Sequence, residues 1–372
     1  MEAHSLRVLV VGQTPPPFGG QAVMIRHMLD GAGDRVRYHH VRMAFSDDME
    51  SVGKFQIGKI LVLFSTIARI IIARLRYRTP VLYYPPSGPN MVPVLRDLFL
   101  LCATRWLFRS TVFHFHASGV STFKHRLPRV LRPLFQWAYG HPALAIRTAA
   151  QNPDDGGALG ASRSIVVPNG LPDMRGTVPE RVAPPQGPFT ILFTGVLIPS
   201  KGVRVLLEAF KLLRDRNVDA HLEVMGKWGD EHFRDDCQAF VLQHGLSERV
   251  HFLGVKRDTE KNRHFAGCDV FCFPSYFEAE SFGLVVAEAM QFAKPVVSTQ
   301  WRGIPSVVED GSSGFLVPIN DPMAIADRLA LLLGDAALRK RMGEAGRRIF
   351  EERFTLQRFH QNMEEAFLSL RP

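Results

Sequence analysis

Short apolar runs alternate with longer amphipathic stretches along the first half of this chain. The apolar runs have the length of buried β-strands and end in turn residues, as Leu6–Gly12 does before the loop PPPFGG at 15–20. Further strands are expected at Val81–Tyr84 and Thr111–Phe115, and helices at 21–29 and around 57–76, 94–108 and 126–139. This alternation predicts βα repeats that form a parallel sheet.

A second domain is indicated by the pattern after residue 188. Residues 172–188 contain five prolines and no apolar period, which is typical of an exposed linker. The βα alternation then restarts, with strands expected at 189–194, 221–225, 250–253, 270–274 and 295–298 and a helix at 203–214. The sequence therefore predicts two doubly wound α/β domains, 1–175 and 189–351, joined by a linker at 176–188. Ligands of such sheets bind at the carboxyl ends of the strands, so we expect a shared cleft.

Composition and charge narrow the class of protein. With 372 residues, 46% hydrophobic and 22% charged, the chain is neither disordered nor fibrous. Four scattered cysteines make no disulfide framework and favour a reducing cytosol. Residues 1–180 hold 21 basic and 11 acidic side chains, whereas the remainder holds 24 and 25. This excess favours contact with an anionic membrane surface over nucleic acid, for which no reader motif occurs; ordinary solubilising charge is the alternative.

No membrane-spanning segment is expected. The first apolar run stops at Gly12, short of a signal peptide, and Lys59 and Arg69 interrupt the apolar stretch 55–75. The segments 54–78, 96–109 and 123–137 mix aliphatic or aromatic residues with Arg and Lys, as helices at membrane interfaces do. Buried helices with snorkelling basic ends are the alternative. We therefore expect a cytoplasmic protein, peripherally associated with the inner face of the membrane.

Two motifs in the second half carry candidate chemistry. In FTGVLIPSKG at 193–202, a strand leads through a loop to Lys201 at the start of a helix, a place that suits phosphate, although a solvated surface lysine would look the same. In EAESFGLVVAEAM at 278–290, Glu280 lies in a loop and Glu288 follows eight residues later. If the helix begins near Ser281, the rise per residue separates these carboxylates by about the length of a nucleotide sugar. The alternative is ordinary helix-terminal and surface charge.

These motifs together resemble the retaining GT-B glycosyltransferases of the group 1, or family 4, type. The resemblance is strongest over 190–316, where Glu280 and Glu288 match the family's paired glutamates. The segments VVPNG at 166–170, KPVVSTQWRGIPSVVEDGSSGFLVP at 294–318 and PPFGGQ at 16–21 are similar to its interdomain segment, donor-side loop and glycine loop. The stretch after about 350 looks like the helix, at about 352–372, that crosses back to the N-terminal domain.

The resemblance implies a role for particular residues. Glu280 and His116 would be catalytic, and Lys201 would contact the donor diphosphate. Glu288 would contact the ribose. The other donor-binding residues would be Gly19, Gly20, Asn169, Gly195, Phe282, Gly283 and Leu284. His114, on the same strand face as His116, is the weaker candidate, and both histidines could simply pack between strands.

The implied activity is metal-independent, retaining transfer of a sugar from a nucleoside diphosphate sugar, without a cofactor, to a saccharide acceptor that is plausibly lipid-linked. No D-x-D motif offers metal ligands. The sequence departs from the family at two places. Val196 stands where the family has a phosphate-binding arginine, and Arg302 or Arg204 would have to replace that arginine. In RGIPS at 302–306, Arg302 and Ser306 stand where the family has Gly and Glu. A nucleotide-sugar epimerase or hydrolase, or a donor-binding pseudoenzyme, remains an alternative.

Overall fold

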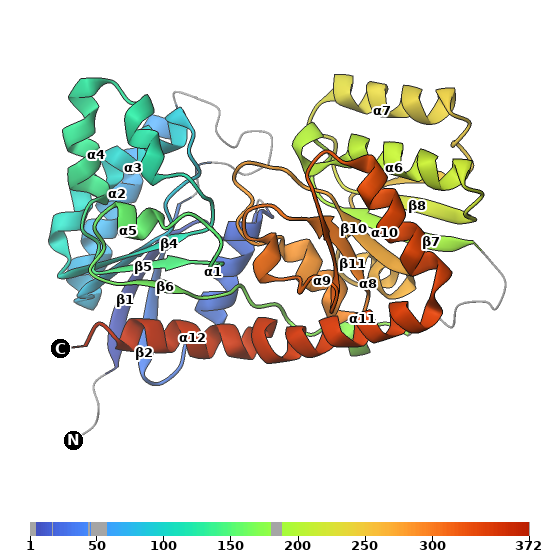
Figure 1. Ribbon diagram of the computed structural model, residues 1–372. Helices are drawn as coiled ribbons and strands as arrows, with labels where there is room; N and C mark the ends of the chain where they lie inside the picture. The colour runs from blue at the N-terminus through green and yellow to red at the C-terminus, as the bar shows by residue number, and fades with distance from the viewer. Residues whose placement is uncertain (1–4, 17, 44, 46–57, 180–187, 372) are drawn as a thin grey trace. The chain divides into compact units, whose positions relative to one another are not determined.

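A computed structural model describes residues 5–16, 18–43, 45, 58–179 and 188–371. The chain divides into two compact units (Figure 1): the first contains Met1–Gly170 and Leu356–Pro372, and the second contains Leu171–Thr355. The first unit ends at Gly170, five residues before residue 175, where the sequence analysis ends the first domain. Most of the expected linker, residues 180–187, lies outside the described residues.

The first unit is built on a parallel sheet of six strands in the order β2-β1-β3-β4-β5-β6. Its strands are β1 (Leu6–Gly12), β2 (Val36–Arg42), β3 (Val81–Tyr84), β4 (Ser110–Phe115), β5 (Leu144–Arg147) and β6 (Ser164–Val166). Every residue of β3 is buried, as expected for a parallel sheet that is covered on both faces.

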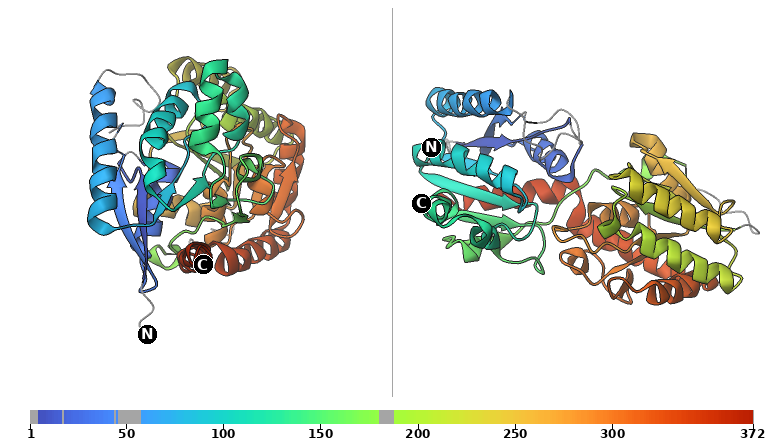
Figure 2. Two further views of the ribbon diagram at one scale, coloured as in Figure 1. Left: turned by 90° about the vertical axis from the view of Figure 1, so that its left-hand side faces the viewer. Right: turned by 90° about the horizontal axis from the view of Figure 1, so that it is seen from above.

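Helices cover both faces of this sheet (Figures 1 and 2). They are α1 (Gly20–Asp30), α2 (Gly58–Tyr77), α3 (Met91–Thr104), α4 (Arg132–Tyr139), α5 (Asp155–Ala158) and α12 (Leu356–Leu368). α3 packs between α2 and α4, whereas α12 packs against α1 and β2. The expected C-terminal helix thus returns to the first unit.

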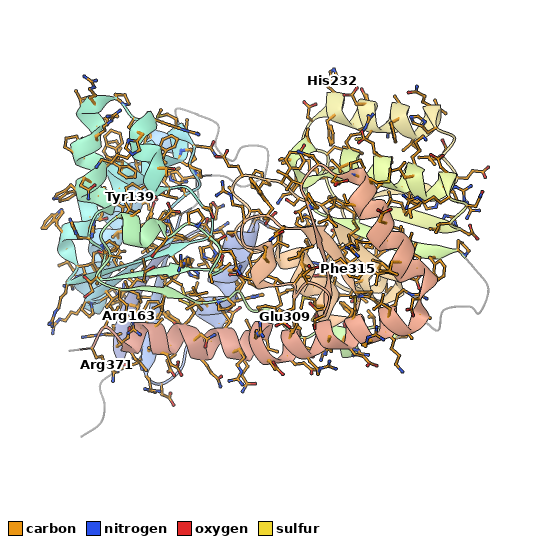
Figure 3. The ribbon with its side chains drawn as sticks, in the orientation of Figure 1. Tyr139, Arg163, His232, Glu309, Phe315 and Arg371 are labelled. Atoms are coloured by element: carbon orange, nitrogen blue, oxygen red, sulfur yellow. The ribbon has the colours of Figure 1, made fainter. Side chains whose placement is uncertain are left out.

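The helix expected at 126–139 is shorter than predicted. Short 3-10 segments at Ser121–Arg126 and Arg129–Leu131 precede α4, which starts only at Arg132 with a proline in its first turn. Proline lacks an amide N–H and is therefore placed at helix starts. Within α4, Tyr139, which is labelled in Figure 3, is buried. Its ring stacks on that of Phe135 with ring centroids 4.5 Å apart.

The second unit repeats the architecture with strand order β12-β11-β10-β7-β8-β9. Its strands are β7 (Phe189–Thr194), β8 (Ala220–Met225), β9 (Val250–Gly254), β10 (Val270–Phe273), β11 (Val296–Thr299) and β12 (Gly314–Val317). Its helices are α6 (Val203–Asp215), α7 (Glu231–Gln243), α8 (Asp258–Gly267), α9 (Leu284–Gln291), α10 (Pro322–Gly334) and α11 (Ala336–Ile349). A π-helical turn, Phe350–Phe354, ends the unit before α12. The predicted fold class, two parallel α/β domains, is confirmed.

Candidate active site

Two loops of the second unit cross where the adjacent strands β7 and β10 end. The backbone N–H of Tyr276, after β10, donates to the carbonyl of Ser200, after β7, at 2.8 Å. Gly202 has φ of 81°, and a Cβ at this position would lie 2.1 Å from the carbonyl oxygen of Pro274. A glycine is therefore required for the close approach of the two loops.

This crossing brings Lys201 and Glu280 together. The Nζ atom of Lys201 lies 2.6 Å from Oε2 of Glu280, and both side chains are largely buried. The hydroxyl of Ser275 donates to the same carboxylate oxygen at 3.1 Å, and the Lys201 ammonium lies 4.6 Å from the centroid of the Phe277 ring. Because the surroundings are apolar, the ion pair and hydrogen bond fix the orientation of the carboxylate. Ser275 had no distinguishing signal in the sequence.

The start of α9 lies next to this pair along the chain. The helix begins at Leu284, not near Ser281 as expected, and Gly283, with φ of 76°, is its N-cap. Glu280 therefore lies outside the helix, so the helical rise does not set its distance from Glu288. The ring of Phe282 is buried and packs edge-on against Phe354 at 5.3 Å, which leaves only its backbone for a ligand. The first N–H groups of α9 have no partner within the helix and suit an anion.

Glu288 has a lysine partner of its own. Oε1 of Glu288, in α9, lies 2.6 Å from Nζ of Lys261, in the first turns of α8. The side chain of Glu288 is 17% exposed and that of Lys261 is 27% exposed, so water and salt screen the attraction between their charges only in part. Because a helix that follows a parallel strand begins at the carboxyl edge of the sheet, both residues lie at the edge that carries Lys201. Sequence reasoning missed Lys261, which resembles any other lysine of a polar helix.

A third loop, after β11, contributes Arg302. The indole N–H of Trp301 donates to the carbonyl of Phe277 at 2.9 Å and so holds this loop against the one after β10. The Arg302 guanidinium stacks over the Trp301 ring at 5.1 Å. Its buried Nε has no hydrogen-bond partner among the described residues. Arg204 lies elsewhere: it pairs with Glu208 at 2.9 Å and covers the Phe240 ring.

The remaining predicted residue of the second unit, Gly195, directly follows β7. Its N–H donates to the carbonyl of Met225 at 3.1 Å. The carbonyl oxygen of Gly195 approaches Gly226 so closely that a Cβ atom on residue 226 would lie 1.8 Å from that oxygen. Gly195 therefore packs against the neighbouring strand end at the carboxyl edge.

The predicted residues of the first unit also lie at the carboxyl edge of its sheet. Gly19 is the N-cap of α1 and Gly20 is the first residue of that helix. The guanidinium of Arg42 holds the preceding loop by donating to the carbonyl of Pro16 at 2.7 Å. Asn169 is buried, and its Oδ1 has no partner in the described part of the chain.

His116 directly follows β4. Its ring centroid is 4.0 Å from that of His114, whose Nδ1 lies 2.9 Å from the hydroxyl of Tyr83. Burial lowers the pKa of His116 to about 3, and burial, with the neighbouring His116, also lowers the pKa of His114. Both imidazoles are therefore neutral at pH 7 and offer hydrogen bonds without charge. The buried Asp155 carboxylate holds the next loop by accepting from the N–H groups of Gly119 and Ser121.

No cluster of three or more His, Cys, Asp or Glu is arranged to hold a metal ion in the part of the chain that the structure describes, residues 5–16, 18–43, 45, 58–179 and 188–371. The candidate site is instead made of ion-paired lysines and glutamates, helix N-termini and a guanidinium that makes no ion pair with a described residue.

Two parallel-sheet units, each with candidate residues at the ends of its strands, have the GT-B architecture. Residues 175–349, nearly the whole second unit, match the family model described as Glycosyl transferases group 1.

Individual relatives agree with this assignment. Over 191 residues the chain is 36% identical to a phosphatidyl-myo-inositol mannosyltransferase of Mycobacterium leprae, covering 51% of this chain and 49% of that protein. The chain spans about half the length, or less, of the curated relatives that it matches first. Among solved structures, HepE of Anabaena in complex with UDP has a TM-score of 0.74 and 18% identity, with 98% of this chain and all of that one covered. Sucrose-phosphate synthase from Thermosynechococcus elongatus has a TM-score of 0.73 and 18% identity, with 98% and 99% covered. At this identity the two structures show the fold alone.

Proposed function

We propose that this protein transfers a sugar from a nucleoside diphosphate sugar to an acceptor. The observation that carries the proposal is the Lys201–Glu280 ion pair, held between two loops beside the N-terminus of α9. The family of the second unit supports it, as does the UDP bound to the structurally similar Anabaena protein.

The residues supply what the reaction needs. Departure of a nucleoside diphosphate develops negative charge, which the ammonium of Lys201 and the N–H groups at the start of α9 would stabilise. Glu280 would accept hydrogen bonds from the transferred sugar, with its orientation fixed by Ser275. The neutral imidazole of His116, in the first unit, would offer a hydrogen bond to a substrate without adding a charge.

We further propose retaining transfer without a metal or other cofactor. This part rests on the resemblance of Glu280 and Glu288 to the family's paired glutamates and on the absence of a D-x-D motif from the sequence. The product should keep the donor's anomeric configuration and should form in the presence of a chelator. An inverted linkage in the NMR spectrum of the product would contradict the retaining assignment.

We propose a lipid-linked acceptor at an anionic membrane surface on the cytoplasmic side. Exposed apolar side chains lie on helices and helical turns of the first unit that also carry arginines; they include Leu61, Phe64, Ile72, Leu75, Phe99, Trp106, Val130 and Trp137. Such a mixture suits the boundary between lipid headgroups and acyl chains. The Mycobacterium leprae relative is named for a phosphatidyl lipid. None of the helices in the described residues is both long and apolar enough to span a bilayer.

A ligand screen tests the donor half of the proposal. UDP, GDP and ADP, with their sugars, should be compared by thermal shift, because a ligand that binds only the native state raises the melting temperature. Lys201→Ala should weaken diphosphate binding by about 1.5 to 3 kcal/mol and leave nucleoside binding unchanged. Lys211→Ala is the matched control, since Lys211 pairs with Asp215 on the exposed side of α6. Binding without turnover would indicate a pseudoenzyme.

A further inference from the structure

The lysines of the candidate site do not provide net positive charge. Lys201 is paired with Glu280 and Lys261 with Glu288, each at 2.6 Å. A nucleoside diphosphate is a polyanion, and binding it requires cationic donors beyond pairs that are already neutral. Another group at this edge of the sheet must therefore supply charge.

Arg302 is the cation of these loops that lacks an acidic partner among the described residues. Its Nε is buried and has no hydrogen-bond partner in the same part of the chain. A buried guanidinium donor that has lost water without gaining an acceptor is costly, so an acceptor from a ligand is the expected partner. The Arg302 guanidinium stacks on the Trp301 ring, and the Trp301 indole N–H donates a hydrogen bond to the carbonyl of Phe277. The ring of Phe277 in turn lies against the Lys201 ammonium.

The backbone at Arg302 is also unusual. Its φ is 50°, in the left-handed region that glycine adopts readily and that arginine rarely adopts. Strained residues of this kind persist where the surrounding structure and the function hold them. Arg204 offers no comparable group, because Glu208 and the Phe240 ring already occupy its guanidinium.

We infer that Arg302 binds the diphosphate of the donor and supplies the positive charge that the two lysine–glutamate pairs do not. The inference rests on the proposed function and names a residue of the same site. A planar guanidinium can donate two parallel hydrogen bonds to phosphate oxygens, which suits it to this role.

The test compares Arg302→Gly, Arg302→Lys and Arg204→Met in the full chain. Arg302→Gly removes the guanidinium while placing at φ of 50° the residue that tolerates it best, so the fold should persist, and its melting temperature checks this. Calorimetry would measure binding of UDP, GDP and ADP and of the corresponding nucleosides. We expect Arg302→Gly to weaken binding of the preferred diphosphate by about ten- to a hundredfold and that of its nucleoside by less than about twofold. Arg302→Lys should recover part of the loss, and Arg204→Met should bind like wild type.

The possible failures can be told apart. If wild-type protein binds a diphosphate and Arg302→Gly binds it equally well, the inference about Arg302 is wrong while the proposed function stands. Equal losses for diphosphate and nucleoside would also overturn it, since they would indicate a change in the shape of the loop. If wild-type protein binds none of the three diphosphates, the proposed function and the inference fall together.

Discussion

The Nζ atom of Lys201 and Oε2 of Glu280 lie 2.6 Å apart, although 79 positions separate these residues in the sequence. Their contact is made by the loops that follow β7 and β10, which Gly202 allows to cross. A diphosphate bound at Lys201 would share the ammonium with Glu280. The carboxylate that we propose faces the sugar and the cation that we propose faces the phosphate are thus positioned by one another.

Glu280→Gln should reduce the rate of transfer by about a hundredfold or more, because it removes the charge that we propose faces the transferred sugar. The fold should persist, since glutamine still accepts a hydrogen bond from Ser275, although loss of the largely buried ion pair with Lys201 should lower the melting temperature. Initial rates with the donor found by the ligand screen measure the effect. Glu278→Gln, two residues away on the exposed part of the loop, is the control and should behave like wild type. Wild-type turnover by Glu280→Gln would remove Glu280 from the mechanism.

Lys261→Met should reduce discrimination between the preferred nucleoside diphosphate and its 2′-deoxy analogue. Lys261 pairs with Oε1 of Glu288. If Oε2 accepts a hydrogen bond from the ribose, as we propose, loss of Lys261 should lower the ratio of the two affinities by about two- to tenfold. Lys256→Met, which removes a lysine paired with Glu260, should leave the ratio unchanged. If Glu288→Gln leaves the ratio of the two affinities unchanged, Glu288 does not contact the ribose.

Stability should fall with acidification below about pH 6.5, the ordinary pKa of histidine in an unfolded chain. Burial lowers the pKa of His116 to about 3 and lowers that of His114 as well, so between these values the unfolded chain binds more protons. Each histidine should therefore lower the free energy of unfolding by up to about 1.4 kcal/mol per pH unit in that window.

Urea unfolding of wild type and His116→Asn between pH 7.5 and 5 measures this dependence, and the variant should show the shallower one. His232→Asn is the control, because its side chain is 85% exposed and lies on the outside of α7 (Figure 3). Equal pH dependences of His116→Asn and wild type would show that folding does not lower the pKa of His116.

Binding to anionic vesicles should weaken as salt rises but should not vanish, because salt screens the arginines and not the burial of apolar side chains. Flotation of the protein with vesicles in a density gradient measures this binding. The double variant Leu61→Ser, Phe64→Ser should float less at every salt concentration. The double variant Arg76→Glu, Arg78→Glu should float less chiefly at low salt. Leu242→Ser, equally exposed on α7 of the second unit, is the control. Arg74 is left intact, since its Nε donates to the carbonyl of Leu107. No flotation of wild type at low salt would rule out the membrane surface.

The hydrophobic pattern alone was sufficient to place the central strands. Leu6–Gly12, Val81–Tyr84 and Phe189–Thr194 were predicted with the bounds that the structure shows, or within one residue, because a strand buried on both faces is a continuous apolar run between turn residues. Strands β2, β5, β6 and β12 were not predicted, because arginines and histidines interrupt the apolar residues of β2, and β5, β6 and β12 each combine a length of three or four residues with a polar or glycine position that shortens the apolar run.

The motifs located Lys201, Glu280 and Glu288 along the chain, but only the tertiary structure decided their partners. Nothing in the sequence separates Lys261 from Lys256, or Arg302 from Arg204, because each is a basic residue in a polar setting. Their different surroundings follow from which loops and helices meet at the carboxyl ends of the strands. Local pattern determines where a strand or helix forms, whereas the neighbours of a side chain depend on segments far away in the sequence, which only the packed sheet brings within hydrogen-bond distance.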